Sequence, residues 1–453
     1  MVALRFDSTV PFSRETVYDW NARPGAVRRL TPPFLAEVLE EPAGGITPGA
    51  RTRLGIRAAP GARLTTEFAR VHPGREYTDR LVRGPLRRWE HRRVFEDLGQ
   101  TTRVRDEVDF ALPARSPGLA ERAVRTAIAR VSTYRQAQLL GDLQFGASHP
   151  GPPLRIAISG STGLIGTQLV AMLSALGHTV VPIVRERHAT PGAIAMDSER
   201  GWVDLAALEG VDVVIHLAGE PISGRFTSAH KRRIAASRIG PTRLLAEAAA
   251  AAGVGAFISA SAIGYYGANP AGEVGEESPP GSDFLSHVCV EWERATQPAR
   301  EAGLRVAHLR TGLVLSPLGG SLAVQLPLFR SGVGGPLAGG DAWQSWISLD
   351  DVVGLYAHAA LDPGVRGPLN AVAPQPVTSG EFASELGHVL SRPAVLPVPA
   401  VGPIALLGRE GARLLAGASQ KVSAVGACAS GYEFRHLTLG SALRHLLGRV
   451  AER

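Results

Sequence analysis

Lysine is nearly absent from this sequence: the 453 residues contain only Lys231 and Lys421. A reaction that needs a lysine cation therefore has only these two positions to draw on. Cysteine is equally scarce, and Cys289 and Cys428 form neither a CxxC motif nor a ligand cluster with the histidines. We therefore expect no structural zinc site, no other metal centre and a reducing compartment.

The sequence also lacks a long apolar run. No stretch approaches the roughly 20 apolar residues that a membrane-spanning helix needs. The first residues, Met1 to Asp7, lack the basic region and apolar block of a signal peptide. With 45% apolar and 20% charged residues, the chain is expected to be a globular cytoplasmic protein with no membrane span.

Positive charge is concentrated in the first third of the chain. Residues 1–150 hold 24 arginines and 17 acidic residues, so this part carries the whole formal charge of +7. A basic domain can bind nucleic acid. However, the arginines alternate with apolar residues in expected strands, and no basic run is interleaved with aromatic residues. We therefore expect solvated strand faces and no nucleic-acid partner.

The length of the chain predicts more than one domain, because a single core rarely serves 453 residues. Small residues, prolines and glycines over residues 147–153 are typical of a linker. We expect a domain over residues 1–146, a dinucleotide-binding domain over 154–394 and a C-terminal segment over 395–453.

A dinucleotide-binding unit is expected directly after this linker. A strand over residues 154–159 is followed by the stretch GSTGLIG at 160–166 and an apolar-periodic run up to Gly177, and a second strand covers 179–184. Strand, glycine loop, helix and strand within about thirty residues form the βαβ unit that binds dinucleotides.

Each glycine of this loop has a distinct physical role. Gly160 lets the chain turn off the strand, Gly163 lets backbone N–H groups approach a pyrophosphate, and Gly166 lets the helix pack close to the sheet. The helix N-terminus offers unpaired N–H donors to the phosphates. The loop residues expected at the dinucleotide are Gly160, Ser161, Thr162, Gly163, Leu164, Ile165 and Gly166.

Further strands alternate with helices along the rest of the chain. They are expected over residues 211–219, 256–262, 305–315 and 367–372, and Asp350 is the expected N-cap of a late helix. This alternation predicts an α/β fold, a doubly wound parallel sheet of the Rossmann type. The ligand crevice then lies beyond the carboxyl ends of the strands.

The end of the second strand bears on the choice of cofactor. Arg185 occupies the expected strand end, where an arginine favours the 2′-phosphate of NADP. Glu186 follows directly, and an acidic residue at that position favours the ribose hydroxyl of NAD instead. If the strand ends one residue later, the preference reverses.

The first 150 residues have a different pattern. One strand over residues 4–10 precedes a helical region over 17–30, and extended segments between residues 53 and 112 precede a long helix after Pro117. This order resembles the START-like helix-grip fold of the SRPBCC superfamily, an α+β fold. The resemblance implies a cavity for a small apolar ligand; the alternative is a filled core.

Several ordered stretches carry a second resemblance, which covers residue 154 to the end. The group is the atypical extended short-chain dehydrogenase/reductases, the NAD-dependent epimerase/dehydratase family (YfcH-type, SulA-like). A piece over 417–447 is similar to the small terminal segment of this family. The stretches are GSTGLIG, HLAGEPISGRFT, SRIGPTRLL, SASAIGYYG, DFLSHVCVEWE, LRTGLVLSPLGG, GGPLAGGDAWQSWISLDDV and GPLNAVAPQPVT.

This resemblance implies NADP(H) as cofactor and an NADP-dependent oxidoreductase or epimerase acting on a small, unidentified substrate. Besides the loop at 160–166, the residues that it implies at the cofactor are Arg185, Leu217, Ala218, Gly219, Glu220, Arg225 and Ser259.

The sequence departs from the superfamily at the Tyr-x-x-x-Lys dyad. The fourth residue after Tyr265 is Asn269, and the fourth after Tyr266 is Pro270. The expected helix over residues 283–294 contains no lysine either. Without a nearby cation, a tyrosine with a pKa of about 10 is a poor base at neutral pH.

Two hypotheses about function remain open. In the first, Ser261 holds a substrate carbonyl and Tyr266 is the acid, with His287 in reserve. Tyr265 and Tyr266 equally fit a packing role under the cofactor, and Cys289 fits a core thiol. In the second, the domain binds NADP(H) without turnover, as a regulator or scaffold coupled to a ligand of the START-like domain.

Overall fold

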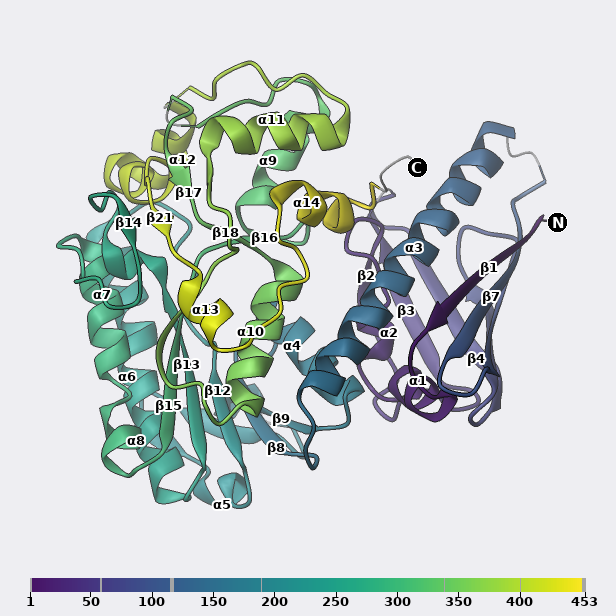
Figure 1. Cartoon of the computed structure of the whole chain (residues 1–453), viewed down its shortest axis with the longest axis horizontal. Helices are drawn as coiled ribbons and strands as arrows, with labels where there is room; N and C mark the ends of the chain where they lie inside the picture. The colour runs from purple at the N-terminus through teal and green to yellow at the C-terminus, as the bar shows by residue number, and fades with distance from the viewer. Residues whose placement is uncertain are drawn as a thin grey trace. The chain divides into compact units, whose positions relative to one another are not determined.

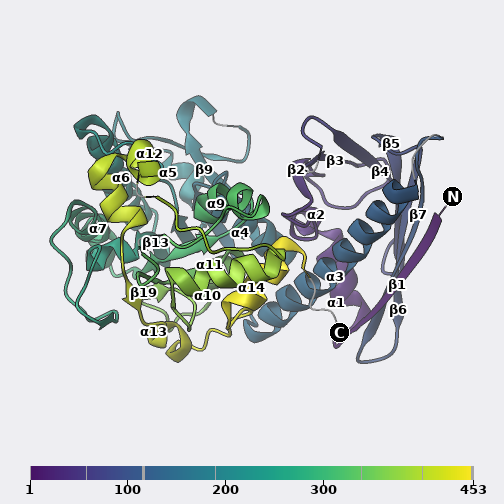
Figure 2. The ribbon, with the colours of Figure 1, turned by 90° about the horizontal axis from the view of Figure 1, so that it is seen from above.

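The computed structural model describes residues 2–57, 59–114, 118–188, 190–337, 339–399 and 401–449. The chain forms two compact units, one of residues 1–151, 170–178 and 444–453, and one of residues 152–169 and 179–443 (Figures 1 and 2). Within the described residues, every helix is too short or too polar to cross a membrane.

The first unit is built on one antiparallel sheet of seven strands in the order β1-β7-β6-β5-β4-β3-β2. Helices α1 (Arg14–Ala22) and α2 (Ala26–Arg29) lie between the first two strands in sequence, and the long helix α3 (Gly118–Ser148) follows the last. The strands are β1 (Val2–Val10), β2 (Ala36–Glu40), β3 (Arg51–Ile56), β4 (Arg63–His72), β5 (Glu76–Arg83), β6 (Arg88–Asp97) and β7 (Thr102–Ala111).

This order of elements matches the predicted one except for β2, which the sequence analysis did not predict. Helix α3 extends to Ser148, two residues into the expected linker. The structure shows a mainly antiparallel α+β unit, and membership of the START-like superfamily stays a prediction.

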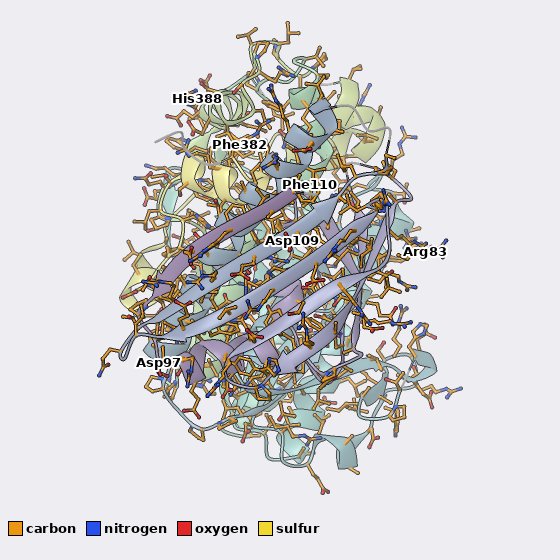
Figure 3. All side chains as sticks on the ribbon, turned by 90° about the vertical axis from the view of Figure 1, so that its right-hand side faces the viewer. Arg83, Asp97, Asp109, Phe110, Phe382 and His388 are labelled. Atoms are coloured by element: carbon orange, nitrogen blue, oxygen red, sulfur yellow. The ribbon has the colours of Figure 1, made fainter. Side chains whose placement is uncertain are left out.

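Buried and partly covered residues alternate along β7, which places the core of this unit on one face of the sheet. Along β7, every second residue from Thr102 to Phe110 is buried and the residues between are only partly covered. Asp109 and Phe110 illustrate the two sides in Figure 3. Helix α3 contributes Ile128, Leu139 and Leu143 to the buried apolar residues.

The interpretation of the strand arginines as solvated is wrong for Arg93, and Arg29 on α2 is buried as well. Arg29 is 1% exposed and donates to both carboxylate oxygens of Asp142, over 2.8 and 2.7 Å. Arg93 on β6 is 2% exposed and donates to both oxygens of Asp106, over 2.7 and 2.8 Å. A buried guanidinium is tolerated here because each has a bidentate carboxylate partner.

The buried pair of Arg29 and Asp142 gives a stability prediction. Asp142→Asn keeps the side-chain shape but leaves the guanidinium without its counter-charge, so the free energy of unfolding should fall by about 3–5 kcal/mol. Urea denaturation of the full chain measures this. Glu121→Gln, which loses an exposed pair with Arg125 on α3, is the control and should cost less than about 1 kcal/mol. Equal losses for the two variants would contradict this account of the buried pair.

The second unit contains an eight-stranded sheet in the order β11-β10-β9-β8-β12-β13-β15-β19. All neighbouring strands are parallel except β10 and β11. The strands are β8 (Arg155–Ser159), β9 (Thr179–Arg185), β10 (Ile194–Asp197), β11 (Trp202–Val203), β12 (Val213–His216), β13 (Ala256–Ala262), β15 (Arg305–Thr311) and β19 (Gly367–Ala371). The predicted Rossmann-type parallel sheet is therefore confirmed.

Helices connect these strands, and short two-stranded pairs complete the unit. The helices after β8 are α4 (Leu164–Ala175), α5 (Leu205–Leu208), α6 (Ser228–Ala251), α7 (Phe284–Arg294), α8 (Gln297–Glu301), α9 (Gly320–Arg330), α10 (Leu349–Leu361), α11 (Ser379–Leu390), α12 (Val401–Gly411), α13 (Val425–Ala429) and α14 (Leu439–Leu447). The pairs are β14 (Glu273–Val274) with β21 (Lys421–Val422), β16 (Leu313–Leu315) with β18 (Trp346–Ser348), and β17 (Trp343–Gln344) with β20 (Val377–Thr378).

The direction in which successive strands are added to the sheet reverses next to β8, and this position is the topological switch point. The chain proceeds outward on one side through β9 and returns on the other side with β12. Ligands of such sheets bind beyond the carboxyl ends of the strands at this point. The expected N-cap Asp350 is wrong by two residues: Ser348 accepts from the backbone N–H of Asp351, and Asp350 lies in the first turn of α10.

Candidate functional site

The glycine loop leaves β8 at the switch point, and two of its glycines are required by close backbone contacts. Gly160 has φ of +70°, and a Cβ there would lie 2.8 Å from the backbone nitrogen of Ala218. A Cβ at Gly166 would overlap the carbonyl oxygen of Gly160. The sharp turn expected at Gly160 and the close helix packing expected at Gly166 both follow from these contacts.

The middle glycine is different. A Cβ at Gly163 would contact only the Gly160 carbonyl oxygen, at 3.3 Å. Thr162 and Gly163 are exposed, while Ser161, Leu164 and Ile165 are partly covered. The fold itself therefore leaves this stretch of backbone accessible, which fits the approach of a pyrophosphate to the start of α4.

The residues expected after β12 line the same edge of the sheet. Leu217, Ala218 and Glu220 are partly covered, and Gly219 is exposed. The backbone N–H of Glu220 donates to Ser237 Oγ over 3.0 Å. Arg225, on the following loop, is exposed. These positions keep their predicted role as cofactor contacts.

The structure distinguishes the two residues at the end of the second strand. Arg185 is the last residue of β9 and is exposed. Its guanidinium has no ion pair or hydrogen bond with any residue that the structure describes. Glu186 begins the next short helix, and its carboxylate accepts from Arg200 Nη1 over 3.2 Å. The arginine is thus available to a ligand and the glutamate already has a cationic partner.

Ser259 lies inside the sheet rather than at a strand end. It is in the middle of β13, is fully buried, and its hydroxyl donates to the carbonyl oxygen of Ala260 over 3.1 Å. The strand ends at Ala262, as predicted, so Ser259 lies three residues before its end. A direct contact between the Ser259 side chain and a cofactor has no support in this geometry.

Ser261 and Tyr266 are joined by a buried ionic network. Ser261 Oγ donates to Glu293 Oε1 over 2.6 Å, and Arg310 donates to both oxygens of Glu293, each over 2.9 Å. Arg310 Nη1 also donates to Tyr266 OH over 3.1 Å, and Tyr266 OH donates to Asn370 Oδ1 over 2.7 Å. Arg310 therefore holds the two candidate side chains in one hydrogen-bonded chain.

Arg310 also packs against the neighbouring aromatic ring. The guanidinium carbon lies 3.5 Å from the ring centroid of Tyr265. This stacking supports the packing role considered for Tyr265. Sequence reasoning missed Glu293 and undervalued Arg310, although an arginine within the buried strand pattern of β15 already indicated a buried acidic partner.

Burial and charge fix the protonation states of the network. Burial alone raises the pKa of Glu293, but hydrogen bonds from Arg310 and neighbouring positive charge hold that pKa below its usual value. Burial raises the pKa of Tyr266 more than its bond from Arg310 lowers it. At neutral pH, Glu293 is therefore a carboxylate and Tyr266 a neutral phenol.

The remaining candidates are less suited to chemistry. Burial raises the pKa of Cys289 to about 12, so this thiol is inert, as expected of a core residue. His287 is exposed on α7. The two lysines are used elsewhere: Lys231 pairs with Glu410 over 2.9 Å, and Lys421 pairs with Glu273 over 3.1 Å.

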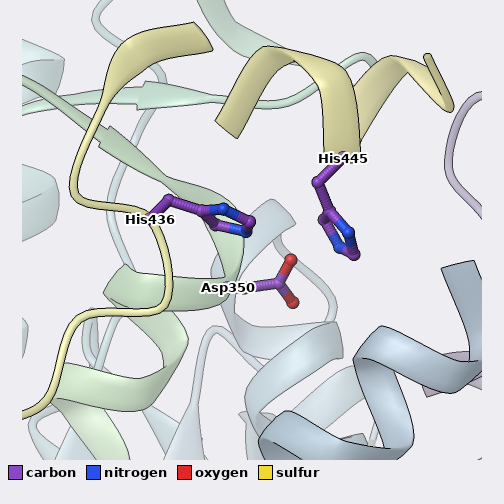
Figure 4. Close-up of side chains that lie close together, drawn as sticks. All are labelled: Asp350, His436 and His445. Carbon is purple, nitrogen blue, oxygen red and sulfur yellow. The ribbon is translucent and has the colours of Figure 1, made fainter. Parts of the chain in front are cut away.

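One acid–imidazole pair lies outside this network. Asp350, in the first turn of α10, and His436, on the C-terminal segment, have atoms within 4.8 Å of each other that could ligate a metal (Figure 4). Both residues have partners within the fold. We assign no metal role to this pair.

Fold and glycine loop together define a dinucleotide-binding protein of the short-chain dehydrogenase/reductase class, and comparison with known proteins agrees. The profile of the NAD dependent epimerase/dehydratase family matches residues 156–368, and a domain of unknown function, DUF1731, matches residues 398–446. An epimerase family protein of Mycobacterium bovis is 42% identical over 298 residues, which is 65% of this chain and 98% of that protein.

Two solved structures are similar. The nucleoside-diphosphate sugar epimerase from Corynebacterium glutamicum has a TM-score of 0.82 and 35% identity, and the match covers 98% of this chain and 90% of that one. Human epimerase family protein SDR39U1, solved with NADPH, has a TM-score of 0.60 and 33% identity, over 66% of this chain and 100% of that one.

The chain belongs to the NAD-dependent epimerase/dehydratase family, among the SDR39U1-like epimerase family proteins. The predicted class of cofactor, a nicotinamide dinucleotide, is thereby confirmed.

The glycine loop gives a second stability prediction. Gly166→Ala drives a methyl group into the Gly160 carbonyl, and such overpacking should lower the free energy of unfolding by about 1–3 kcal/mol. Gly163→Ala is the matched control, because its methyl group would meet the same carbonyl oxygen at 3.3 Å instead of overlapping it; it should cost much less than Gly166→Ala. Thermal unfolding of the ligand-free proteins compares the two. A larger loss for Gly163→Ala would show that the helix does not pack as described.

Proposed function

We propose that this protein is an NADP(H)-binding oxidoreductase or epimerase of the extended short-chain dehydrogenase/reductase type, acting on a small molecule. The Arg185 guanidinium, which has no ion pair or hydrogen bond with the described residues, carries the NADP(H) assignment, because it lies at the strand end where a 2′-phosphate is recognised. The NADPH bound to human SDR39U1 supports the same choice. We further propose that the protein acts in the cytoplasm.

The residues around the glycine loop suit such a cofactor. The start of α4 offers N–H donors to phosphate oxygens, and the exposed backbone at Gly163 leaves room for a phosphate to approach them. When bound, the nicotinamide would supply the hydride-transfer chemistry. Side chains at the carboxyl ends of β13 and β15 would handle the protons of the reaction.

Ser261 is our first candidate for proton handling. Its hydroxyl lies 2.6 Å from a Glu293 carboxylate oxygen, which is in place to accept the serine proton. Tyr266 is the second candidate and donates to Asn370 instead. Arg310 orients both residues and balances the charge of Glu293.

The second candidate function is a regulator or scaffold that binds NADP(H) without turnover. The absence of the Tyr-x-x-x-Lys dyad from the sequence favours it. So do the internal hydrogen bonds that occupy both Ser261 and Tyr266. Ligand binding in the first unit, which we propose to be START-like, would supply the regulatory input.

Cofactor choice is tested by Arg185→Asp. Loss of the cation and introduction of a carboxylate should shift the ratio of NADPH to NADH affinities toward NADH by at least about tenfold, which corresponds to about 1.4 kcal/mol. Calorimetric titration with each cofactor measures the ratio. Arg243→Asp, which alters an exposed arginine of α6 that contacts Glu247, is the control and should leave the ratio unchanged. An unchanged ratio in Arg185→Asp would remove this residue from the cofactor site.

The proton-handling role is tested by Ser261→Ala. We expect kcat for NADPH oxidation against a panel of carbonyl compounds to fall by at least about tenfold, as loss of a general acid–base group predicts. NADPH affinity should change less than about twofold, because the hydroxyl handles protons and does not hold the cofactor. Ser331→Ala, at an exposed hydroxyl, is the control. Full activity in Ser261→Ala would exclude the serine from the chemistry, and a wild-type protein inert toward the whole panel would favour the regulator.

A further inference from the structure

The first unit contains a cavity between the inner face of its sheet and its helices. Its volume is about 80 Å³, and it is bounded by residues of α1, α2, α3 and strands β3 to β6. A single water needs roughly 10–15 Å³ by this measure. The cavity is thus large enough for several waters or one small organic molecule.

Part of the cavity wall is apolar and part of it is charged. Leu54, Leu64 and Phe68 contribute apolar surface, and Asp79, His91 and Arg135 contribute charged groups. The START-like resemblance implies a cavity for an apolar ligand, with a filled core as the alternative, so the charged side is an addition that only the structure reveals. The charges decide which molecule fits.

His91 is held between two carboxylates. Its Nδ1 lies 2.8 Å from Asp79 Oδ1, and its Nε2 lies 2.7 Å from Asp106 Oδ1. A carboxylate only accepts hydrogen bonds, so both ring nitrogens must donate and the ring is an imidazolium. Burial by itself lowers the pKa of His91, but the two carboxylates raise it further, to a value above normal.

Counting the charges leaves one cation without a partner. The carboxylates of Asp79 and Asp106 balance His91 and the bidentate Arg93. Arg135, on α3, donates from Nε to the carbonyl oxygen of Leu30 over 3.2 Å and forms no ion pair with the described residues. One positive charge is therefore uncompensated at the cavity wall.

A buried hydroxyl at the cavity wall also lacks a partner among the described residues. Thr52 on β3 is only 5% exposed, and its Oγ1 makes no hydrogen bond with the described residues. Thr66 on β4 lies directly across from it in the sheet register and also lines the cavity. An unsatisfied buried hydroxyl costs about 1–3 kcal/mol, a cost that a bound polar group would remove.

We propose that this cavity binds a small organic carboxylate, with its carboxylate at Arg135 and the Thr52 hydroxyl and its apolar body against Leu54, Leu64 and Phe68. The planar guanidinium matches a carboxylate in a two-bond arrangement. A single negative charge balances the single surplus cation, whereas a doubly charged phosphate would leave a negative charge in an apolar cavity. The proposal stands independently of the NADP(H) site.

Calorimetry and saturation-transfer NMR on the full chain test this with three probes: hexanoate, 1-hexanol and acetate. Hexanoate should bind at least tenfold more tightly than 1-hexanol, which lacks the charge, and more tightly than acetate, which lacks the apolar body. Equal binding of hexanoate and 1-hexanol would identify a purely apolar site and overturn the proposal. No binding of any probe at millimolar concentration would identify a water-filled cavity and overturn it as well.

Substitutions of Arg135 test whether hexanoate binds at this residue. Arg135→Gln should weaken hexanoate binding at least tenfold, and Arg135→Lys less, because lysine keeps the charge without the fork. Arg125→Gln, on the exposed side of α3 where Arg125 contacts Glu121, is the control and should not change it.

Thr52→Val keeps the shape and removes the unsatisfied hydroxyl. It should raise the unfolding temperature of the ligand-free protein while weakening hexanoate severalfold, which separates loss of binding from loss of folding. Unchanged hexanoate affinity in both Arg135→Gln and Thr52→Val would overturn the proposal. NADPH affinity should be the same in all these variants, so a failure here is distinguishable from a failure of the cofactor assignment.

Discussion

The second unit depends on one close contact, the approach of the start of α4 to the end of β8. Gly166 has no room for a Cβ against the Gly160 carbonyl, and Gly160 has little against the backbone of Ala218. This contact fixes where the helix N-terminus points and brings the ends of β8 and β12 together. The exposure of Gly163 at the switch point follows from that packing, and ligands of such sheets bind at this point.

Buried charge shapes both units in the same way. Arg29, Arg93 and Arg310 are each buried and each held by a bidentate carboxylate. Pairs of this kind impose geometry on what they touch. Through Arg310, the orientation of Ser261 is coupled to that of Tyr266. In the first unit, Arg135 has no carboxylate partner among the described residues. This uncompensated charge is the basis of the proposed carboxylate ligand.

The features that the sequence predicted correctly depend on residues close together in the chain. The glycine loop, its flanking strands and the strand-end Arg185 lie within about thirty residues, and their roles follow from backbone geometry and spacing. Pairs of residues that lie far apart in the sequence could not be predicted in this way. Arg29 and Asp142 are 113 residues apart, and no periodicity links Arg310 to Glu293. The strand over residues 256–262 was predicted with its observed bounds, but Ser259 was placed at the cofactor by the family resemblance alone, and its position in the middle of β13 contradicts that placement.

Calorimetric titration of the wild-type full chain with NADPH and with NADH tests the central claim most directly. The free guanidinium at the end of β9, beside an accessible glycine loop, predicts saturable NADPH binding at one site and at least tenfold weaker binding of NADH. Preference for NADH would mean that Glu186 leaves Arg200 to take the ribose position. Absence of binding to either cofactor would contradict the assignment of this crevice as a dinucleotide site.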